Sequence, residues 1–492
     1  MTTTEQAIRS GIKEAAAVLA QDQATSNRPE AFTYVPPTHA RALDLDATLI
    51  EGIRGAGKSF WFSLLASPKH LSFVRTSFPE ARLPQDVKVA QGFGMGLSIT
   101  QAPDAETLAG LMEQKFRERS IWRAVLAHHT GVGGGFVGLK SWTDRVRWVQ
   151  QNPEAFAHEI EQADQSLSSK GETLLVLFDA LDRMADDWQH INKLAKGLLQ
   201  VALDMRSTRA IRCKVFVRPD LLQDPNVISF ADYSKLLATK ASLVWHRADL
   251  YALLYQCLGN ASVSRKQFAT WVGRSRAPAT TNAATDWAVP SNLRHDEDRQ
   301  EALFERLAGK AMGSSIKRGK RGKPYTWLVN HLQDGLNQVS PRSFLAALGK
   351  AAAETADDYE LPLDYRGIQR GVQEASQIRV QEITEDYPWV KQVMDPLRGN
   401  LTVPCASSEI ERIWTSEQTL VQLEALLKKG QAAVKLPPQN LEQGPSGILI
   451  DLEALGMVQR MEGKRIQMPD VFRVAFGFGR RGGVTPLKWR AP

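Results

Sequence analysis

The feature that most constrains this chain is the octapeptide from Gly52 to Ser59, which fits the pattern G-x-x-x-x-G-K-[ST] without deviation. It follows the apolar pair Leu49–Ile50 and precedes a helix-like run from Phe60 to Ala66, which stops before Pro68. The pattern is specific only when a strand precedes it and a helix follows it. Because both flanks are present, the sequence predicts a phosphate-binding loop rather than a chance glycine-rich turn.

The residue types in this loop suit a nucleotide. Glycines let the backbone curl so that its N–H groups face an anion at the positive end of the following helix. Lys58 is then placed to reach the β- and γ-phosphates, and the hydroxyl of Ser59 to ligate Mg²⁺. We expect ATP and Mg²⁺ as ligands, and GTP is less favoured because the sequence has no N-K-x-D guanine motif. The predicted nucleotide-contacting residues are Gly52, Ile53, Arg54, Gly55, Ala56, Gly57, Lys58, Ser59 and Phe60.

A second motif begins with five consecutive apolar residues, Leu174 to Phe178, and ends in Asp179. Such a run suits a parallel strand buried on both faces, and ligand groups collect at the carboxyl ends of such strands. Asp179 is therefore predicted to hold Mg²⁺ together with Ser59, acting through water. Many P-loop ATPases carry an acid at the next position, which is Ala180 here. Asp182 either positions the attacking water or is the N-cap of the following helix.

This pairing of motifs resembles the AAA+ and STAND branches of the P-loop ATPases over residues 45–355. Those proteins place a small residue after the metal-binding acid and another acid three positions on, as in Asp179-Ala180-Leu181-Asp182. The resemblance implies a "sensor 1" residue at the end of the next strand, where this chain has Arg218. Arg218 either faces the γ-phosphate or is a surface residue paired with Asp220.

The resemblance also implies a "sensor 2" arginine on a helix of a lid. Ser340 and Pro341 fit the start of a helix, with Ser as the N-cap and Pro at the first position. Arg342 then lies in the first turn, where the helix dipole disfavours a cation. It either contacts the nucleotide or forms an interhelical salt bridge. Self-assembly is implied too, with an arginine supplied across the subunit interface, for which Arg183 and Arg247 are candidates.

The pattern along the chain predicts an α/β core with a parallel sheet and flanking helices, an all-helical lid and a C-terminal winged-helix-like α+β module. The predicted domains are 1–44 (helix and arm), 45–246 (core, with a long insertion at about 76–170), 247–385 (lid) and 386–492 (module with a basic tail). Predicted strands lie at 49–50, 71–74, 174–178, 214–217 and 243–245. The insertion contains a formal G-x-G-x-x-G at 131–138, which we interpret as a flexible loop beside the solvent-facing His128 and His129.

The C-terminal module is predicted from a helix at 446–456 followed by a hairpin of 457–461 and 465–468. Its recognition-helix segment, 448–455, holds two acids and no base, which favours packing on protein over the DNA major groove. Residues 460–492 hold eight Lys or Arg and two acids, a composition able to grip DNA phosphates. The run from Lys317 to Lys323, followed by Tyr325 and Trp327, either tracks a phosphate backbone or is a solvated loop.

Composition sets the wider bounds. The 492 residues carry 61 Lys and Arg against 54 Asp and Glu, a net charge of +7 that permits a polyanionic partner without requiring one. Three scattered cysteines form no disulfide framework and no metal-ligand pattern. No apolar run approaches the roughly 18–20 residues of a membrane span, so we expect a cytoplasmic protein with no membrane contact.

Three functions fit these observations. The first is an ATP-hydrolysing switch that controls protein assembly or signalling through a homo-oligomer and a separate partner protein. The family resemblance adds the expectation of a bacterial defence or mobile-element setting, such as antiviral defence. The second is a DNA-associated ATPase, either a loader or a regulator of transposition or replication. The third is a nucleotide-stabilised scaffold with little turnover, which Ala180 suggests.

Overall fold

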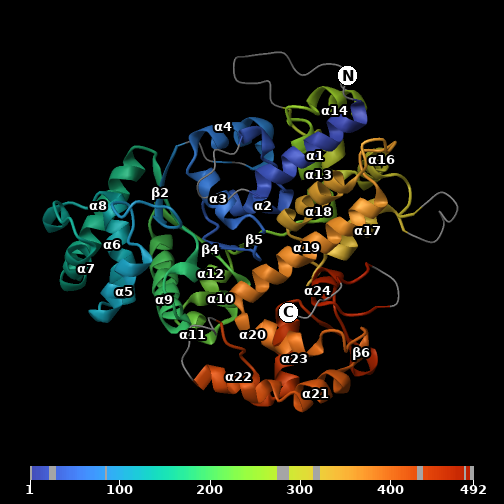
Figure 1. The fold of residues 1–492 in the computed structure, drawn as a ribbon. Coiled ribbons are helices and arrows are strands. Elements are labelled where there is room, and N and C mark those ends of the chain that lie inside the picture. Colours follow the sequence, from blue (N-terminus) through green and yellow to red (C-terminus); the bar gives the residue numbers. More distant parts are fainter. Residues whose placement is uncertain are drawn as a thin grey trace. The chain divides into compact units, whose positions relative to one another are not determined.

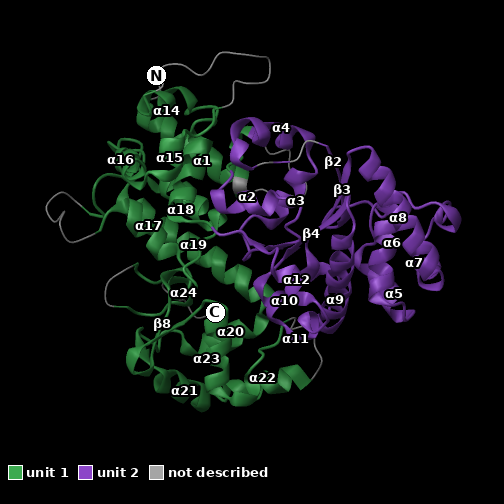
Figure 2. Ribbon diagram, turned by 180° about the vertical axis from the view of Figure 1, so that it is seen from behind, with its two compact units in different colours: residues 1–21, 31–34, 245–492 green, residues 22–30, 35–244 purple. Residues whose placement is uncertain are grey.

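The computed structural model describes residues 3–20, 29–81, 83, 86–273, 287–313, 322–428, 436–480 and 484–487 (Figure 1). The chain divides into two compact units (Figure 2). We call residues 22–30 and 35–244 the sheet unit, and residues 1–21, 31–34 and 245–492 the helical unit. No helix within the described residues combines the length and apolar character needed to cross a membrane.

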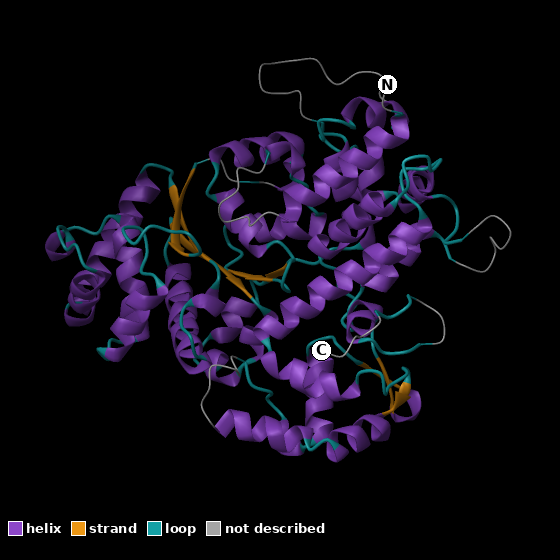
Figure 3. Ribbon diagram, viewed as in Figure 1, coloured by secondary structure: helices purple, strands orange, loops and turns teal. Residues whose placement is uncertain are grey.

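The sheet unit is built on a five-stranded, wholly parallel sheet in the order β2-β3-β4-β1-β5 (Figure 3). Parallel neighbours need crossover connections, which here are mostly helical, so helices flank the sheet. This confirms the predicted α/β core. The strands are β1 (Leu49–Glu51), β2 (Val87–Phe93), β3 (Thr173–Phe178), β4 (Ile211–Val217) and β5 (Ala241–Ser242).

The three strands predicted at 49–50, 174–178 and 214–217 coincide with β1, β3 and β4. The strand predicted at 71–74 is wrong, because these residues lie inside helix α4 (Pro68–Ser77). The strand predicted at 243–245 lies just beyond β5. Sequence patterning missed β2 altogether, so the segment predicted as an insertion at about 76–170 in fact supplies an edge strand of the sheet.

Alternate residues of β4 show how the two faces of the sheet are covered. Val215 and Val217 belong to the large apolar core that includes residues of α6 and α9. Phe216 faces the other way, with its ring 6.3 Å from that of Phe62 on α3. On the core side, Phe178 at the end of β3 meets Trp122 edge-on at 5.8 Å. Burial on both faces explains the continuous apolar runs of these strands.

Four helices lie between β2 and β3, and α6 and α8 pack on these strands. The G-x-G-x-x-G segment follows α6 rather than a strand. Phe136 within it is buried, and Gly133 donates its N–H to the Glu159 carboxylate at 2.8 Å. The helices of the sheet unit are α2 (Pro37–Leu43), α3 (Lys58–Leu65), α4 (Pro68–Ser77), α5 (Ala105–Glu113), α6 (Glu118–Thr130), α7 (Trp142–Gln151), α8 (Pro153–Ser169), α9 (Trp188–Asp204), α10 (Pro219–Gln223), α11 (Pro225–Ile228) and α12 (Tyr233–Leu237).

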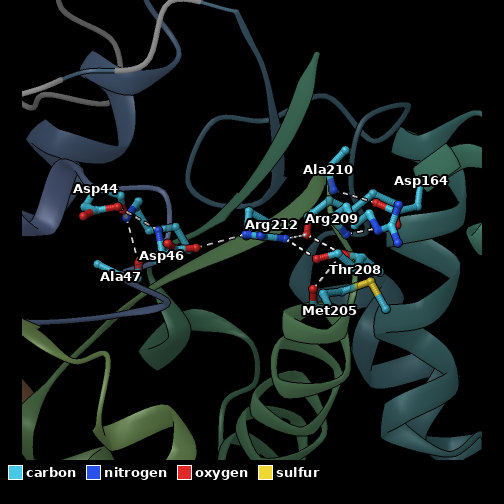
Figure 4. Close-up of polar contacts among 11 residues, drawn as sticks. Asp44, Asp46, Ala47, Asp164, Met205, Thr208, Arg209, Ala210 and Arg212 are labelled. Atoms are coloured by element: carbon cyan, nitrogen blue, oxygen red, sulfur yellow. Dashed lines mark hydrogen bonds and ion pairs between the residues drawn. The ribbon is translucent and has the colours of Figure 1, made fainter. Parts of the chain in front are cut away.

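Polar contacts fix the amino-terminal edge of this sheet (Figure 4). Arg212, near the start of β4, pairs with Asp46 at 3.3 Å in the segment that leads into β1. The carboxylate of Asp164 on α8 accepts the backbone N–H groups of Arg209 and Ala210 at 2.9 and 2.6 Å. Asp164 thus satisfies backbone N–H groups just before β4, at the edge opposite the one where the predicted ligand groups lie.

The helical unit contains the predicted all-helical segment. Its longest helix, α19, packs closely along α18, and the N-terminal helix α1 packs on the same α18. The helices up to this point are α1 (Thr4–Ala20), α13 (Arg247–Leu258), α14 (Arg265–Trp271), α15 (Ser291–His295), α16 (Glu297–Ala308), α17 (Pro324–Leu332), α18 (Pro341–Glu354) and α19 (Tyr365–Asp386).

The C-terminal part of the helical unit has winged-helix topology. Strand β6 precedes three helices, α21 to α23, and the antiparallel pair β7 and β8 follows them, with β8 in the middle of the sheet. The predicted helix ends as expected, with Gly456 at a φ of 69° after α23. The elements are α20 (Pro388–Met394), β6 (Cys405–Ala406), α21 (Ser407–Ser416), α22 (Thr419–Lys428), α23 (Pro445–Ala454), β7 (Gln459–Met461), β8 (Arg465–Gln467) and α24 (Asp470–Phe476).

Candidate nucleotide site

The predicted phosphate-binding loop connects β1 to α3, as the motif requires. Gly52 donates its N–H to the carbonyl of Val217 at 3.1 Å, which ties the start of the loop to the end of β4. Gly55 and Gly57 have φ values of 80° and 106°, a left-handed region that favours glycine. Gly57 is the N-cap of α3, so the loop ends at the positive end of a helix dipole. Ile53, Arg54 and Ala56 complete the turn.

Lys58 begins α3 and folds back over the loop. Its ammonium nitrogen donates to the carbonyl oxygens of Gly52 at 2.8 Å and Ile53 at 3.1 Å. Burial lowers the pKa of Lys58 to about 8, an effect that Asp179 opposes and Arg218 strengthens. The amine therefore lies in a site that is short of water, where a phosphate anion would restore a full ionic partner.

The carboxylate of Asp179 follows β3 and is 3% exposed. Its backbone N–H donates to the carbonyl of Phe93 at 2.9 Å, which places it beside the end of β2. Burial raises the pKa of Asp179, while a hydrogen bond from Ser59 and the charge of Lys58 act in the opposite direction. The structure thus brings the two predicted Mg²⁺ ligands, Ser59 and Asp179, into contact.

Oxygen ligands of this kind match what Mg²⁺ requires, namely a carboxylate, a hydroxyl and substrate phosphates. Lys58 lies within electrostatic reach of Asp179, Asp182, Arg218 and Asp220. The donor set and the glycine-lined turn therefore fit Mg²⁺ and a polyphosphate. Phe60 continues α3 with its ring 5.1 Å from that of Trp61.

Asp182 lies in a short 3-10 turn after β3 and contacts a cation. Ala180 takes a left-handed φ of 56° ahead of this turn. The carboxylate of Asp182 lies 3.8 Å from a guanidinium nitrogen of Arg218. The alternative interpretation of Asp182 as the N-cap of the next helix is wrong, because Asp187 caps α9 by accepting the N–H of His190.

Arg218 follows β4, and its side chain is only 11% exposed, so it is not a surface residue. Its pairing with Asp220 is present, with the guanidinium donating to both carboxylate oxygens at 3.0 and 3.2 Å. Neighbouring strands bring these groups together, since β3 pairs with β4. From the sequence, Asp220 was considered only as the ion-pair partner of a surface arginine. Its position two residues after Arg218 is the signal that could have placed it in the site.

The predicted sensor 2 residue, Arg342, lies in the helical unit. Ser340 is the N-cap of α18 and Pro341 its first residue, as predicted, but the Ser340 side chain makes no capping hydrogen bond. Arg342 donates to Glu382 on α19 at 3.1 Å, so the interhelical salt bridge exists. A nucleotide contact by Arg342 stays a prediction.

The two candidates for a trans-acting arginine differ in their contacts. Arg183 is exposed at the end of the 3-10 turn after β3. Arg247 at the start of α13 contacts Glu297 and Asn330, both at 3.3 Å. Arg247 is thus engaged within its own helical unit.

Two histidines predicted to face solvent do not. His128 and His129, in the last turn of α6, are half-buried, and burial lowers the pKa of His129 to about 4. Their ring centroids lie 5.0 Å apart, and His128 also meets Trp142 edge-on. The described residues contain no group of three or more His, Cys, Asp and Glu side chains that could hold a metal ion.

The basic run and its aromatics are only partly described. Residues 317–321 of the run lie outside the described residues, and Lys323 pairs with Glu301. Tyr325 is buried, and its hydroxyl donates to Gln300 at 2.7 Å, so it offers no stacking surface to a nucleic acid. Trp327 stacks on His331 with ring centroids 3.9 Å apart.

The five tail cations that the structure describes fall into two groups. Arg473 is fully buried and bound to Asp470, and Arg480 pairs with the same carboxylate. Arg460, Lys464 and Arg465 are exposed on the hairpin of β7 and β8. The remaining three, Arg481, Lys488 and Arg490, lie outside the described residues.

The acids of α23 are both compensated. Asp451 is 6% exposed and accepts the backbone and side-chain N–H groups of Asn440 at 3.0 and 2.6 Å. Glu453 pairs with Arg460 at 2.9 Å. The exposed positions of α23, Ser446, Ile450 and Ala454, are uncharged, and the side chain of Glu453 beside them is 40% exposed. The helix is therefore less acidic in effect than its sequence indicates.

Comparison with known proteins returned structural likeness only. No protein-family model and no curated protein matches the sequence. The ORC1 protein of Aeropyrum pernix, solved in complex with DNA, is 13% identical, covers 92% of this chain and 93% of its own, and gives a TM-score of 0.34. The ORC2 protein of the same organism, solved in ADPNP and ADP complexes, is 15% identical over 89% of this chain and 93% of its own, with a TM-score of 0.29.

A third solved structure, Cdc6p from Pyrobaculum aerophilum, is 10% identical, covers 91% of this chain and 93% of its own, and gives a TM-score of 0.27. At these scores the likeness supports no functional conclusion. The fold described above follows from the strand order and connections of the chain itself.

Proposed function

We propose that the chain is a Mg²⁺-dependent, ATP-binding and ATP-hydrolysing switch of AAA+ type. The observation that carries the proposal is the convergence of Lys58, Ser59 and Asp179. A partly buried lysine amine and a buried carboxylate lie together at the end of a glycine-rich loop, and the carboxylate accepts a hydrogen bond from the serine hydroxyl. A polyphosphate with Mg²⁺ supplies the charges that this buried arrangement needs.

Each predicted residue has a role in this proposal. The backbone of Gly52–Phe60 cradles the phosphates, and Lys58 neutralises them. Ser59 and Asp179 hold Mg²⁺, which supplies positive charge where negative charge develops. Asp182 orients the attacking water, and Arg218 and Arg342 sense the γ-phosphate. Turnover is slow and requires self-assembly, with Arg183 or Arg247 supplied by a neighbouring copy.

For the output of the switch, a DNA-associated function is favoured over a purely protein-directed one. Two exposed cations, Lys464 and Arg465, lie on the hairpin of the winged-helix-like module, where they can contact phosphates, while Arg460 beside them is paired with Glu453. The objection from the acidic helix weakens, because Asp451 and Glu453 are compensated internally. The exposed side of α23 carries no basic residue, which predicts contact with the DNA backbone by the hairpin rather than base readout by the helix.

A protein-assembly or signalling switch is the second candidate, and the observation that favours it is Ile450, which is 40% exposed on α23. An apolar side chain there suits a protein surface better than a DNA groove. In that case the output needs a separate partner protein.

The test is ATP turnover by the wild type and by Lys58→Ala, each with and without duplex DNA at two salt concentrations. We expect turnover that depends on Lys58 and rises with DNA at low salt. Turnover that depends on Lys58 but ignores DNA would support the protein-directed switch. No turnover in either protein would leave a nucleotide-stabilised scaffold.

A separate variant tests whether the hairpin contacts DNA. Replacing Lys464 and Arg465 together by Gln should reduce the slope of log affinity against log salt by about 2, because each phosphate contact contributes about 0.9. Lys391→Gln, which removes an exposed cation of α20 outside the hairpin, is the matched control and should leave the slope unchanged. Equal slopes for all three proteins would exclude the hairpin as the DNA contact.

A further inference from the structure

Arg218 lies between two carboxylates that contact different nitrogens of its guanidinium. The Nε and Nη2 atoms donate to Oδ1 and Oδ2 of Asp220 at 3.0 and 3.2 Å. The third nitrogen, Nη1, lies 3.8 Å from Oδ2 of Asp182. Asp220 therefore makes a two-point contact with the side of the guanidinium. Nη1 instead faces Asp182, the residue predicted to orient the attacking water.

The local sequence explains why Asp220 takes this place. Arg218 is the N-cap of α10, Pro219 is its first residue, and Asp220 lies in its first turn. The proline ring fixes the backbone between the two charged residues. The backbone carbonyl of Asp220 accepts the N–H of Asp224 at 3.1 Å, so the backbone that carries the Asp220 carboxylate is held in a helical turn. An acid in the first turn also suits the helix dipole.

We infer that Asp220 is a positioning residue, which orients the guanidinium of Arg218 so that Nη1 faces the γ-phosphate side of the site. This inference rests on the proposed function, because it assigns a specific job within the same site. It is compatible with both interpretations of Arg218: the residue pairs with Asp220 through Nε and Nη2 and senses phosphate through Nη1.

The physical reason is the mobility and charge of an arginine side chain. A two-point ion pair fixes the plane of the guanidinium before ligand binds, which avoids the cost of ordering a long side chain later. Without Asp220, the cation near Lys58 loses its main counter-charge. Arg218 then pairs more closely with Asp182 and withdraws that carboxylate from the attacking water.

The competing explanation is that the pair merely stabilises the turn between β4 and α10. The two explanations differ in whether the effect of losing Asp220 requires Arg218. Four proteins separate them: wild type, Asp220→Asn, Arg218→Ala and the double variant. Asp186→Asn is the matched control, since Asp186 is an exposed carboxylate in the loop after β3.

In the Asp220→Asn variant we expect kcat to fall at least about tenfold, with the KM for ATP within about threefold of the wild type. The double variant should match Arg218→Ala, and Asp186→Asn should match the wild type. An equal loss of kcat from Asp220→Asn in the Arg218→Ala background would overturn the inference, as would a loss of thermal stability with kcat unchanged.

A second readout keeps the inference separate from the proposed hydrolysis. The ratio of the dissociation constants for ADP and a non-hydrolysable ATP analogue reports γ-phosphate recognition without turnover. We expect Asp220→Asn to lower the preference for the analogue in the wild-type background and to change nothing in the Arg218→Ala background. If the wild type does not hydrolyse ATP, the catalytic part of the proposed function fails, and this ratio alone decides the inference. An unchanged ratio in Asp220→Asn would overturn it.

Discussion

The ammonium nitrogen of Lys58 lies 2.8 Å from the carbonyl oxygen of Gly52, six residues before it in the same loop. A second carbonyl, that of Ile53, lies 3.1 Å away. These neutral acceptors satisfy the N–H groups of the lysine but do not replace a counter-ion. Because the amine is buried, the charged form is destabilised, and the pKa of Lys58 falls to about 8.

This lowered pKa predicts a pH dependence of nucleotide binding. A polyphosphate binds the protonated amine, so above pH 8 the ligand-free protein must take up a proton to bind. We expect the dissociation constant for ATP to be flat from pH 7 to about 8 and then to rise, by at most tenfold per pH unit. Lys58→Arg keeps its charge throughout and should show no such rise. Parallel pH profiles for the two proteins in equilibrium titrations would refute the assignment.

The crossing of α18 and α19 depends on a glycine. A Cβ atom placed on Gly371 of α19 would lie 2.0 Å from the backbone carbonyl oxygen of Ala347 on α18. Gly371→Ala must therefore separate the helices, and we expect it to lower the free energy of unfolding by at least about 2 kcal/mol. Gly110→Ala, in the interior of α5 with no atom within 4 Å of the added carbon, is the control.

This control should stabilise the protein by about 0.5–1 kcal/mol, because alanine loses less backbone entropy in a helix than glycine does. Chemical denaturation followed by circular dichroism measures both changes. A shift of the same sign in both variants would show that close helix approach is not the reason for the glycine at 371.

The sequence predicted the strands that are buried on both faces, since their apolar runs are continuous. It missed β2, an edge strand whose sequence Val87–Phe93 mixes Lys88, Gln91 and Gly92 among apolar residues and whose first five residues are only partly buried or exposed. The false strand at 71–74 is a short apolar run inside α4. Runs of this length cannot be assigned from periodicity, because helix and strand bury them equally well.

The site was predictable where it is contiguous in sequence. Lys58 and Ser59 come from one motif and Asp179 from another, and each motif carries its own strand context. The contact between Asp182 and Arg218 depends on β3 lying beside β4, which no local pattern specifies. The burial of Arg473 could not be predicted either, because it depends on the folded structure. From the sequence alone, a cation in a basic tail is expected to be exposed.

A buried lysine in the sheet predicts how stability varies with pH. Lys214 on β4 is 0% exposed and donates to the carbonyl oxygens of Asp44 and Ala47, both at 2.7 Å. Burial lowers the pKa of Lys214 to about 7 from its ordinary value of 10.5. Between these values the unfolded chain binds more protons than the folded protein, so the free energy of unfolding rises with pH.

In the wild type, we expect Lys214 to make the free energy of unfolding rise by at most about 1.4 kcal/mol per pH unit between pH 7 and 10. Lys214→Met should lack this contribution to the slope. The absolute stability of the variant also falls, because two backbone carbonyls lose their donor, so the comparison concerns the slope alone. Urea denaturation at half-unit pH steps gives this slope. Identical slopes for the wild type and Lys214→Met would mean that Lys214 does not titrate in this range.

Arg342 offers the sharpest test of the sensor prediction in the helical unit, because the same two helices supply a matched control. Arg342 on α18 pairs with Glu382 on α19, while Arg370 on α19 pairs with Glu354 on α18. The pair of Arg370 lies nearer the surface and should contribute only about 0–1 kcal/mol to stability, whereas Arg342 pairs with a buried carboxylate that Arg379 also contacts. If Arg342 also contacts the nucleotide, only its substitution weakens ligand binding, so the comparison concerns affinity rather than stability.

We expect Arg342→Ala to weaken binding of a non-hydrolysable ATP analogue at least about fivefold, which corresponds to a loss of about 1 kcal/mol in binding free energy. Arg370→Ala should leave that affinity within experimental error of the wild type. Equilibrium titration of the three proteins gives the affinities, and thermal unfolding confirms that both variants remain folded. Unchanged affinity in Arg342→Ala would reduce Arg342 to an interhelical ion pair and remove it from the nucleotide site.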